Sequence, residues 1–239
     1  MTHPEQGSPQ GGVVSPCLSN VFLHSVLDEW FEREVRPRLK GQSFLIRYAD
    51  DLVIGFSCEE DARRVMEVLP KRFEKYGLTL HPEKTRLVPF ERPSDRPERP
   101  GPQERIPAGT SDLLGFTHYW GRSRNGHWVV KRKTSKGRIS RGLKALAQWL
   151  RKELHSALAA QHRTLSQKLR GHFAYYGITG NADALKRFRH AAVRLWRKWL
   201  SRRNRDGPMP WDRMNRLLEH YPLPPALVVH SVYRQAATP

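Results

Sequence analysis

The chain has 239 residues, and its 42 Lys and Arg against 23 Asp and Glu give a formal net charge of +19 at neutral pH. Hydrophobic residues make up 38% and aromatic residues 10%, which is enough to fill a core and excludes a fibrous or wholly disordered chain. The sequence has no apolar run that would span a membrane, no secretory signal pattern and only two cysteines, so we expect a cytoplasmic protein without a disulfide framework or a four-ligand zinc site.

The positive charge is concentrated in the second half. Residues 1–100 carry 15 basic and 16 acidic side chains, whereas residues 101–239 carry 27 and 7. Such an excess repels itself unless a polyanion is bound, so the second half is expected to bind nucleic acid. A solvated cationic face and a membrane surface are the alternatives. Aromatic residues among the cations favour nucleic acid, because bases stack on them: Trp120, Trp128, Trp149, Tyr175, Tyr176, Trp196 and Trp199.

The first predicted element is a helix. A loop over residues 5–12 leads into Ser15, an expected N-cap, and Pro16 in the first turn. Apolar residues then recur at helical spacing, so one side of the helix is expected to be buried: Leu18, Val21, Phe22, Val26, Leu27, Trp30 and Phe31.

Two β-rich runs, 43–48 and 52–56, predict a hairpin after this helix. A capping box of Ser57 and Glu60 then opens a helix that ends near Tyr76. Two further short strands are predicted at 78–80 and 85–90. Together these elements indicate an α+β layer in which an antiparallel sheet has helices on one face.

The second half predicts a hairpin followed by a helical bundle. Residues 91–109 are rich in proline and indicate a linker. Runs 113–120 and 128–133 form a hairpin across Asn125 and Gly126. Helices are expected at 140–158, 161–176, 181–201 and 211–220. The expected domain ranges are 1–90, 91–111, 112–136 and 137–239.

Asp50 and Asp51 stand side by side at the turn of the first predicted hairpin. Neighbouring carboxylates repel each other unless a cation lies between them, and hard oxygen ligands suit Mg²⁺. An Asp-rich turn chosen for its backbone preference is the alternative, because Asp is common in turns. The pair is therefore a candidate magnesium site.

Several motifs flank this pair in a particular order. GSPQGG occupies residues 7–12, YADD 48–51, a Gly-Leu pattern ending in Lys-Thr 77–85, LLGF 113–116 and RGHFAYYG 170–177. In this order and spacing they resemble motifs B, C, D and E and the thumb signature of the reverse transcriptases, or maturases, encoded by bacterial group II introns. The resemblance implies a partial reverse-transcriptase palm followed by a mainly α-helical thumb or maturase (X) domain.

The resemblance also implies roles for palm residues. Asp50 would hold the catalytic Mg²⁺ ions with help from Asp51, and strand alternation makes them unequal ligands. Lys84 would face the triphosphate, with an ordinary strand-edge lysine as the alternative. The residues expected against template and nucleotide are Gln10, Gly11, Gly12, Tyr48 and Ala49. The primer grip would be Leu114, Gly115 and Phe116, unless these residues are simply core.

In the thumb, adjacent Tyr175 and Tyr176 face different directions, so one is expected in the bundle and the other outside, and the sequence does not decide which. The basic residues expected to contact RNA phosphates are Arg163, Lys168, Arg170, Arg187, Arg189, Arg194, Arg197 and Lys198.

The family takes another essential carboxylate from motif A, upstream of motif B, and here the only earlier acid is Glu5. We therefore expect a C-terminal piece of such an enzyme, with an uncovered apolar sheet face and unpaired strand edges. One hypothesis is an RNA-directed DNA polymerase that uses primer, template, dNTP and Mg²⁺ once a separate palm and fingers fragment docks. The other is a non-catalytic module that binds group II intron RNA for splicing in a cytoplasmic ribonucleoprotein. Nonspecific nucleic-acid binding is a third hypothesis.

Overall fold

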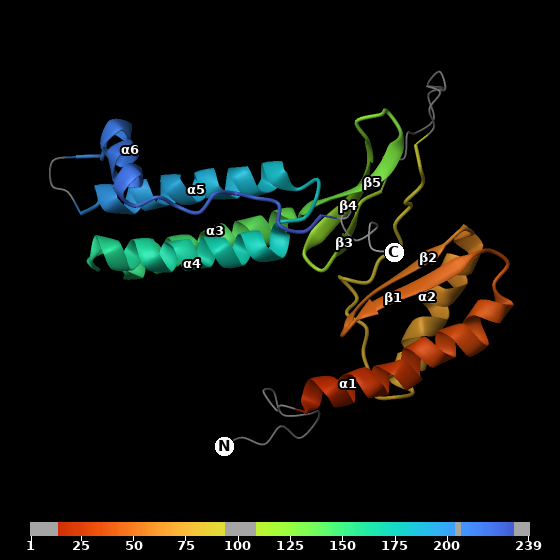
Figure 1. The fold of residues 1–239 in the computed structure, drawn as a ribbon. Coiled ribbons are helices and arrows are strands. Elements are labelled where there is room, and N and C mark those ends of the chain that lie inside the picture. The colour runs from red at the N-terminus through yellow and green to blue at the C-terminus, as the bar shows by residue number, and fades with distance from the viewer. Residues whose placement is uncertain (1–13, 94–108, 204–206, 232–239) are drawn as a thin grey trace, which may run out of the picture. The chain divides into compact units, whose positions relative to one another are not determined.

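A computed structural model of the chain describes residues 14–93, 109–203 and 207–231 (Figure 1). The chain divides into two compact units, Met1–Glu91 and Arg92–Pro239. The fold mixes helices with two small antiparallel sheets, one of two strands and one of three. Within the described ranges, no helix is long and apolar enough to cross a membrane.

The first unit begins with a long helical segment. It starts as α1 (Ser15–Leu23), continues through the π-helical turns η1 (His24–Asp28) and η2 (Phe31–Val35), and ends in the 3₁₀ turn η3 (Arg36–Arg38). Val14, rather than the expected Ser15, is the N-cap residue.

Only the later turns of this helical segment are buried. Val26, Leu27, Trp30 and Phe31 form the core of the first unit with residues of the second helix. The prediction that the whole apolar stripe is buried is wrong, because this core forms around the later turns alone. The exposed residues of the stripe are Leu18, Val21 and Phe22.

A hairpin and a second helix complete this unit. Strands β1 (Ser43–Tyr48) and β2 (Asp51–Phe56) pair antiparallel with each other, and α2 (Glu59–Glu74) follows. One sheet face packs against the helices through Leu45, Leu52, Ile54 and Phe56. Helices therefore cover one face of this small sheet, as Figure 1 shows.

The opposite sheet face is open among the described residues. Phe44, Ile46 and Tyr48 alternate along β1 and are 54%, 52% and 68% exposed. Each strand of the hairpin also has one edge without a partner strand in the part of the chain that the structure describes. The expected uncovered apolar face and unpaired edges are thus both present.

Two local expectations for this unit are wrong. Residues 78–80 and 85–90 form no strands, because neither run pairs with another described strand. The Leu78 N–H instead donates to the Phe73 carbonyl at 2.9 Å, and Leu78 and Leu80 pack against the core. The expected capping box is also absent, because Cys58 is the N-cap and the Ser57 hydroxyl instead accepts the backbone N–H of Gln42 at 2.8 Å.

The second unit contains a three-stranded meander. The strands are β3 (Ser111–Leu113), β4 (Phe116–Arg122) and β5 (Trp128–Thr134), paired in chain order. The sequence predicted one strand over 113–120. The structure breaks this run into a two-residue turn, because Leu114 and Gly115 both adopt positive φ.

Four helices follow: α3 (Lys136–Lys152), α4 (Leu158–Tyr176), α5 (Ala182–Ser201) and α6 (Trp211–His220). The first starts four residues before the expected position, at the end of β5, and ends six residues earlier. The core of this unit lies between the helices, where Leu150, Leu165, Leu169, Leu185 and Trp196 are almost fully buried. Most of the predicted proline-rich linker lies outside the described residues.

Candidate active-site turn and nucleic-acid interface

The aspartate pair lies at the end of the β1–β2 hairpin. Tyr48 pairs with Asp51, so the turn itself consists of Ala49 and Asp50, and Ala49 adopts a positive φ of 51°. A non-glycine residue in this conformation is uncommon and costs about 1 kcal/mol or more. Asp50 therefore lies in the turn, whereas Asp51 is the first residue of β2.

Both carboxylates are available for a ligand. Both side chains are exposed, and neither carboxylate forms a hydrogen bond or ion pair with any described residue. By register, Asp51 shares the open sheet face with Tyr48, on the side away from the helices. Adjacent carboxylates without a cationic partner supply the hard oxygen donors that a divalent ion prefers. The pair fits Mg²⁺ as part of a site.

These two side chains do not make a complete metal site. Within the described ranges, no group of three or more His, Cys, Asp or Glu side chains is close enough to hold a metal ion. The remaining ligands would have to be water, substrate oxygens or groups outside these residues.

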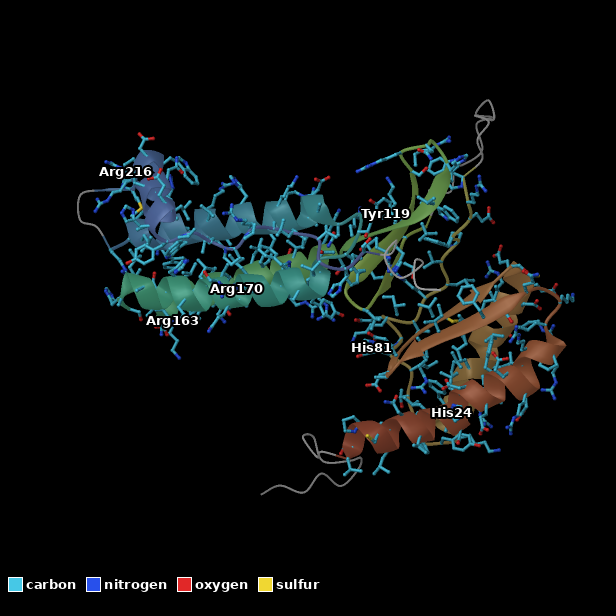
Figure 2. All side chains as sticks on the ribbon, in the orientation of Figure 1. His24, His81, Tyr119, Arg163, Arg170 and Arg216 are labelled. Atoms are coloured by element: carbon cyan, nitrogen blue, oxygen red, sulfur yellow. The ribbon has the colours of Figure 1, made fainter. Side chains whose placement is uncertain are left out.

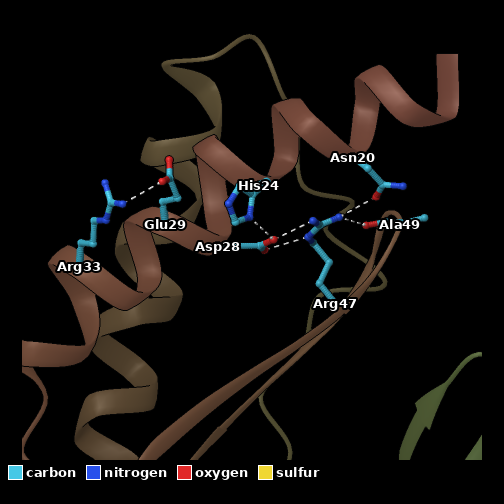
Figure 3. A network of polar contacts seen from close by, with 7 residues as sticks. All are labelled: Asn20, His24, Asp28, Glu29, Arg33, Arg47 and Ala49. Carbon is cyan, nitrogen blue, oxygen red and sulfur yellow. Dashed lines mark hydrogen bonds and ion pairs between the residues drawn. The ribbon is translucent and has the colours of Figure 1, made fainter. Parts of the chain in front are cut away.

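An arginine in β1 fastens the turn to the helical layer (Figure 3). Arg47 donates from Nε to Asp28 Oδ1 at 2.8 Å and from Nη2 to Asp28 Oδ2 at 2.7 Å. Its Nη1 donates to the side-chain oxygen of Asn20 at 2.9 Å and to the carbonyl of Ala49 at 3.2 Å. A single guanidinium thus links the metal-candidate turn to α1 and η1.

The ion pair between Arg47 and Asp28 is largely sheltered from water. Their side chains are 13% and 25% exposed, and the bidentate geometry is the strongest form of such a pair. The hydrogen bonds from Arg47 hold the pKa of Asp28 below its usual value, and Asp28 in turn raises the pKa of Arg47. Both side chains are therefore charged at neutral pH.

The sequence reasoning missed Arg47, Asp28 and Asn20. A signal was present, because Arg47 occupies the same inward register as Leu45 and a charge on that face requires a partner. No local pattern predicts that Asp28 is this partner, because Asp28 lies 19 residues earlier and faces the hairpin only because η1 packs there.

The other predicted palm residues are less informative. Lys84 is exposed in a turn and forms no ion pair with either aspartate. The expected template contacts Gln10, Gly11 and Gly12 lie outside the described residues.

In the second unit, the residues predicted as the primer grip contact Tyr175 and Tyr176. Tyr175 donates its hydroxyl to the Leu114 carbonyl at 3.0 Å, and its ring stacks on Phe116 with centroids 5.9 Å apart. Tyr176 meets Phe116 edge-on at 5.2 Å and packs against the helical core. Tyr176 is thus the inward residue and Tyr175, 54% exposed, the outward one.

A buried asparagine joins the meander to the bundle, and no local pattern marks it in advance. The Asn181 side chain accepts the Thr134 backbone N–H at 2.9 Å and donates to the Thr134 hydroxyl and the Tyr176 carbonyl, both at 2.8 Å.

Most of the basic side chains predicted as phosphate contacts are exposed on the bundle. Arg163 and Arg170 are seven residues apart, about two turns, and so project from one side of α4 (Figure 2). Across described residues 136–203 and 207–223, no Lys or Arg pairs with an acidic side chain. Those predicted as phosphate contacts and found exposed are Arg163, Lys168, Arg170, Arg187, Arg194 and Lys198.

Four of the predicted phosphate contacts also have partners within the fold. Lys168 lies 5.5 Å from the centre of the Trp149 ring, and Arg187 donates to the Asp183 carbonyl at 3.3 Å. Arg189 donates to the backbone carbonyls of Pro224 and Leu223 at 3.0 and 3.3 Å. Arg197 is half-buried, and its guanidinium lies 4.3 Å from the centre of the Trp211 ring. These two arginines tie α5 to the segments around α6, so their first role is structural.

The aromatic residues among the cations are not a stacking platform as a set. Trp196 is fully buried and donates to the Gln161 side-chain oxygen at 3.0 Å, and Trp149 and Trp199 pack against the core. Among the seven aromatics of this expectation, Tyr175 is the exposed one. Most of these aromatic residues pack in the core of the bundle, so the positive charge is the stronger indication of nucleic-acid binding.

The described features define a mixed helix and sheet protein with a two-aspartate turn and a cationic helical unit. Residues 2–118 match the model of the reverse transcriptase (RNA-dependent DNA polymerase) family. The match covers the aspartate turn and its helices and ends within β4, before the bundle. No curated protein matches the chain.

Proposed function

We propose that the chain carries the carboxylate turn and the RNA-binding helices of a group II intron reverse transcriptase and maturase. The observation that carries this proposal is the exposed, unpartnered Asp50–Asp51 pair at a hairpin turn within the segment that matches reverse transcriptases. The reaction class is RNA-directed DNA synthesis, in which a primer hydroxyl attacks the α-phosphate of a dNTP and pyrophosphate leaves.

Asp50 and Asp51 would hold the divalent ions, which activate the attacking hydroxyl and offset charge on the leaving group when bound. Tyr48 and Ala49 lie beside the carboxylates, and the small Ala49 side chain leaves room for the primer end. Arg47 keeps this turn attached to the helical layer through Asp28. Lys84, exposed in its turn, is a candidate partner of the triphosphate.

A third carboxylate is needed for transfer by two metal ions, and the described residues place no third acid with this pair. In the family that the sequence resembles, this carboxylate comes from a strand preceding the glycine-rich motif. We propose that polymerisation depends on such a segment, in the same polypeptide or in a docked partner.

The thumb would bind intron RNA and the primer–template duplex. Its exposed cations carry no internal counter-ions, so they are available to phosphates. The contact of Tyr175 with Leu114 would join the helices to the primer-grip turn as one rigid surface. We place this complex in a cytoplasmic ribonucleoprotein.

The test is a reconstitution. The full chain is mixed with a polypeptide carrying the upstream palm and fingers, an RNA template, a DNA primer, dNTPs and Mg²⁺, and primer extension is measured. We expect extension that Asp50→Ala abolishes and that Asp212→Ala, a change of an exposed aspartate in α6, leaves intact. Absence of product in every combination would exclude the polymerase.

A non-catalytic splicing module is the second candidate, favoured by the unpaired cations of the bundle. In that case Asp50→Ala leaves both the affinity for intron RNA and the splicing rate unchanged. Equal affinity for intron RNA and for arbitrary duplex DNA would point instead to nonspecific binding.

A further inference from the structure

Four of the five N–H directions of the Arg47 guanidinium are occupied, and none of them by Asp50 or Asp51. Two go to the Asp28 carboxylate, one to Asn20 and one to the Ala49 carbonyl. The Ala49 carbonyl belongs to the residue immediately before Asp50. The cation is therefore held next to the carboxylate turn without pairing with it.

Asp28 determines this outcome. It is the one acidic partner of Arg47 in the described structure, and it binds both Nε and Nη2 from the helical side of the hairpin. Asn20, the other side-chain partner, is neutral and takes a single N–H. Besides Asp28, the negative charge that acts on this guanidinium is that of Asp50.

We propose that Asp28 is a positioning residue that holds Arg47 on the helical layer and neutralises it, so that Asp50 keeps its full charge for a divalent cation. This inference rests on the proposed function, because it takes the aspartate pair as the metal site. Asp28 touches neither metal nor substrate and acts through Arg47. Its loss would release a cation that competes for the Asp50 carboxylate.

The experiment measures binding of Mn²⁺ alone to the full chain, from the loss of the free-ion electron paramagnetic resonance signal. The Mn²⁺ sites that are lost in Asp50→Ala are assigned to the turn. Asp28→Asn is expected to weaken that site about tenfold or more, because a positive charge within a few ångströms of a carboxylate has effects of this size. The double variant Asp28→Asn with Arg47→Gln, which removes both charges, is expected to bind within about twofold of the wild type.

Glu32→Gln is the matched control. It frees Arg36 from an exposed ion pair in the same helical segment and changes the net charge by the same amount as Asp28→Asn. We expect no change at the turn. Weakening as large as that of Asp28→Asn would mean that net charge, and not the position of Arg47, controls the affinity, which overturns the proposal.

Two other results would also overturn it. One is unchanged Mn²⁺ affinity in Asp28→Asn, and the other is a double variant as weak as Asp28→Asn, since a purely structural role would not be rescued by removing Arg47. If Asp28→Asn does not fold, the test is made with Arg47→Gln. The proposal expects this variant to bind Mn²⁺ at the turn no more weakly than the wild type, and weaker binding contradicts it. If Asp50→Ala removes no Mn²⁺ site, the proposed metal site and this inference both fail. If Asp50→Ala removes a site but Asp28→Asn does not weaken it, the metal site is supported and only this inference fails.

Discussion

Buried polar side chains hold the second unit together at the level of single residues. Asn181 is 1% exposed, and all of its side-chain hydrogen bonds go to protein groups at the junction of β5, α4 and α5. A buried backbone N–H that loses its acceptor costs about 1–3 kcal/mol. Residues of this kind contribute more to stability than the exposed charges that dominate the sequence.

Asn181→Ala is therefore expected to lower the free energy of unfolding by about 2–3 kcal/mol, because the Thr134 N–H loses its acceptor. Denaturant unfolding followed by circular dichroism measures the change. The matched control is Asn215→Ala in α6, where the side chain is exposed and a change within about 0.5 kcal/mol is expected. Equal effects of the two substitutions would show that the Asn181 network adds nothing.

His172 makes the stability of the helical bundle depend on pH. Its ring stacks on Phe188 with centroids 3.7 Å apart, its Nε2 has no hydrogen-bond partner among the described residues, and burial lowers its pKa from 6.5 to about 4. The unfolded state therefore binds a proton at a higher pH than the folded state does. The stability due to the neutral ring is complete above pH 6.5 and is lost as the pH falls toward 4.

We predict that His172→Phe removes this dependence. The free energy of unfolding of the variant, relative to wild type, should rise as the pH falls from 6.5 to 4, in chemical denaturation at several pH values. A change of an exposed histidine, His155→Gln, should give a curve parallel to wild type. A constant difference between His172→Phe and wild type would contradict the prediction.

At the scale of elements, two hairpin turns carry the residues of interest, and helices set the position of each. The Ala49–Asp50 turn is attached to η1 through Arg47 and Asp28, and the Leu114–Gly115 turn is attached to α4 through Tyr175 and Tyr176. Both turns contain a non-glycine residue with a φ of 51°. Such backbone persists where surrounding contacts determine it.

Gly115 tests how tightly the second turn is held. A Cβ there would lie 2.9 Å from the Tyr176 hydroxyl, and φ is +81°. Gly126 has the same φ of +81° with nothing within 4 Å of its Cβ position, so Gly126→Ala carries the backbone cost without the contact. We expect Gly115→Ala to lower the melting temperature by several degrees more than Gly126→Ala. Equal shifts would mean that the Tyr176 hydroxyl moves aside freely.

At the scale of the whole molecule, charge separates the two units. Exposed ion pairs such as Lys40 with Glu60 lie in the first unit, whereas the described helices of the second have cations without acidic partners. A nucleic acid that neutralises those cations releases its own counter-ions, so binding weakens steeply with salt. The bundle thus has the electrostatics of a phosphate-binding surface, although most of its tryptophans serve the core.

Intron RNA affinity of the full chain is therefore expected to fall linearly on a plot of log K against log salt concentration. Replacing Arg163 and Arg170, which project from one side of α4, by Ala should reduce the slope by about 2 in total, one for each phosphate contact. Arg36→Gln, a change of an ion-paired arginine in the first unit, should leave the slope unchanged. Filter binding over a range of KCl concentrations gives both values, and an unaltered slope in the α4 variant would exclude that face.

Much of the architecture is readable from local pattern. The strands of the first hairpin, the end of α4 and both ends of α6 agree with the periodicity and turn residues, because propensity and hydrophobic spacing act over a few neighbouring positions. The strands expected at 78–80 and 85–90 failed, since a strand exists only where another strand supplies its hydrogen bonds. The aspartate pair could be predicted as a candidate metal site because its two residues are adjacent in the chain.

The amino-acid sequence by itself determined the net charge, the two-aspartate turn and the order of motifs that resembles reverse transcriptases. The tertiary structure alone decided that Arg47 is paired with Asp28, that Tyr176 points inward while Tyr175 faces outward, and that Trp196 belongs to the core. The physical reason is that these contacts join residues from 19 to 61 positions apart. Packing brings such residues together, and no local pattern encodes which of many distant side chains will meet.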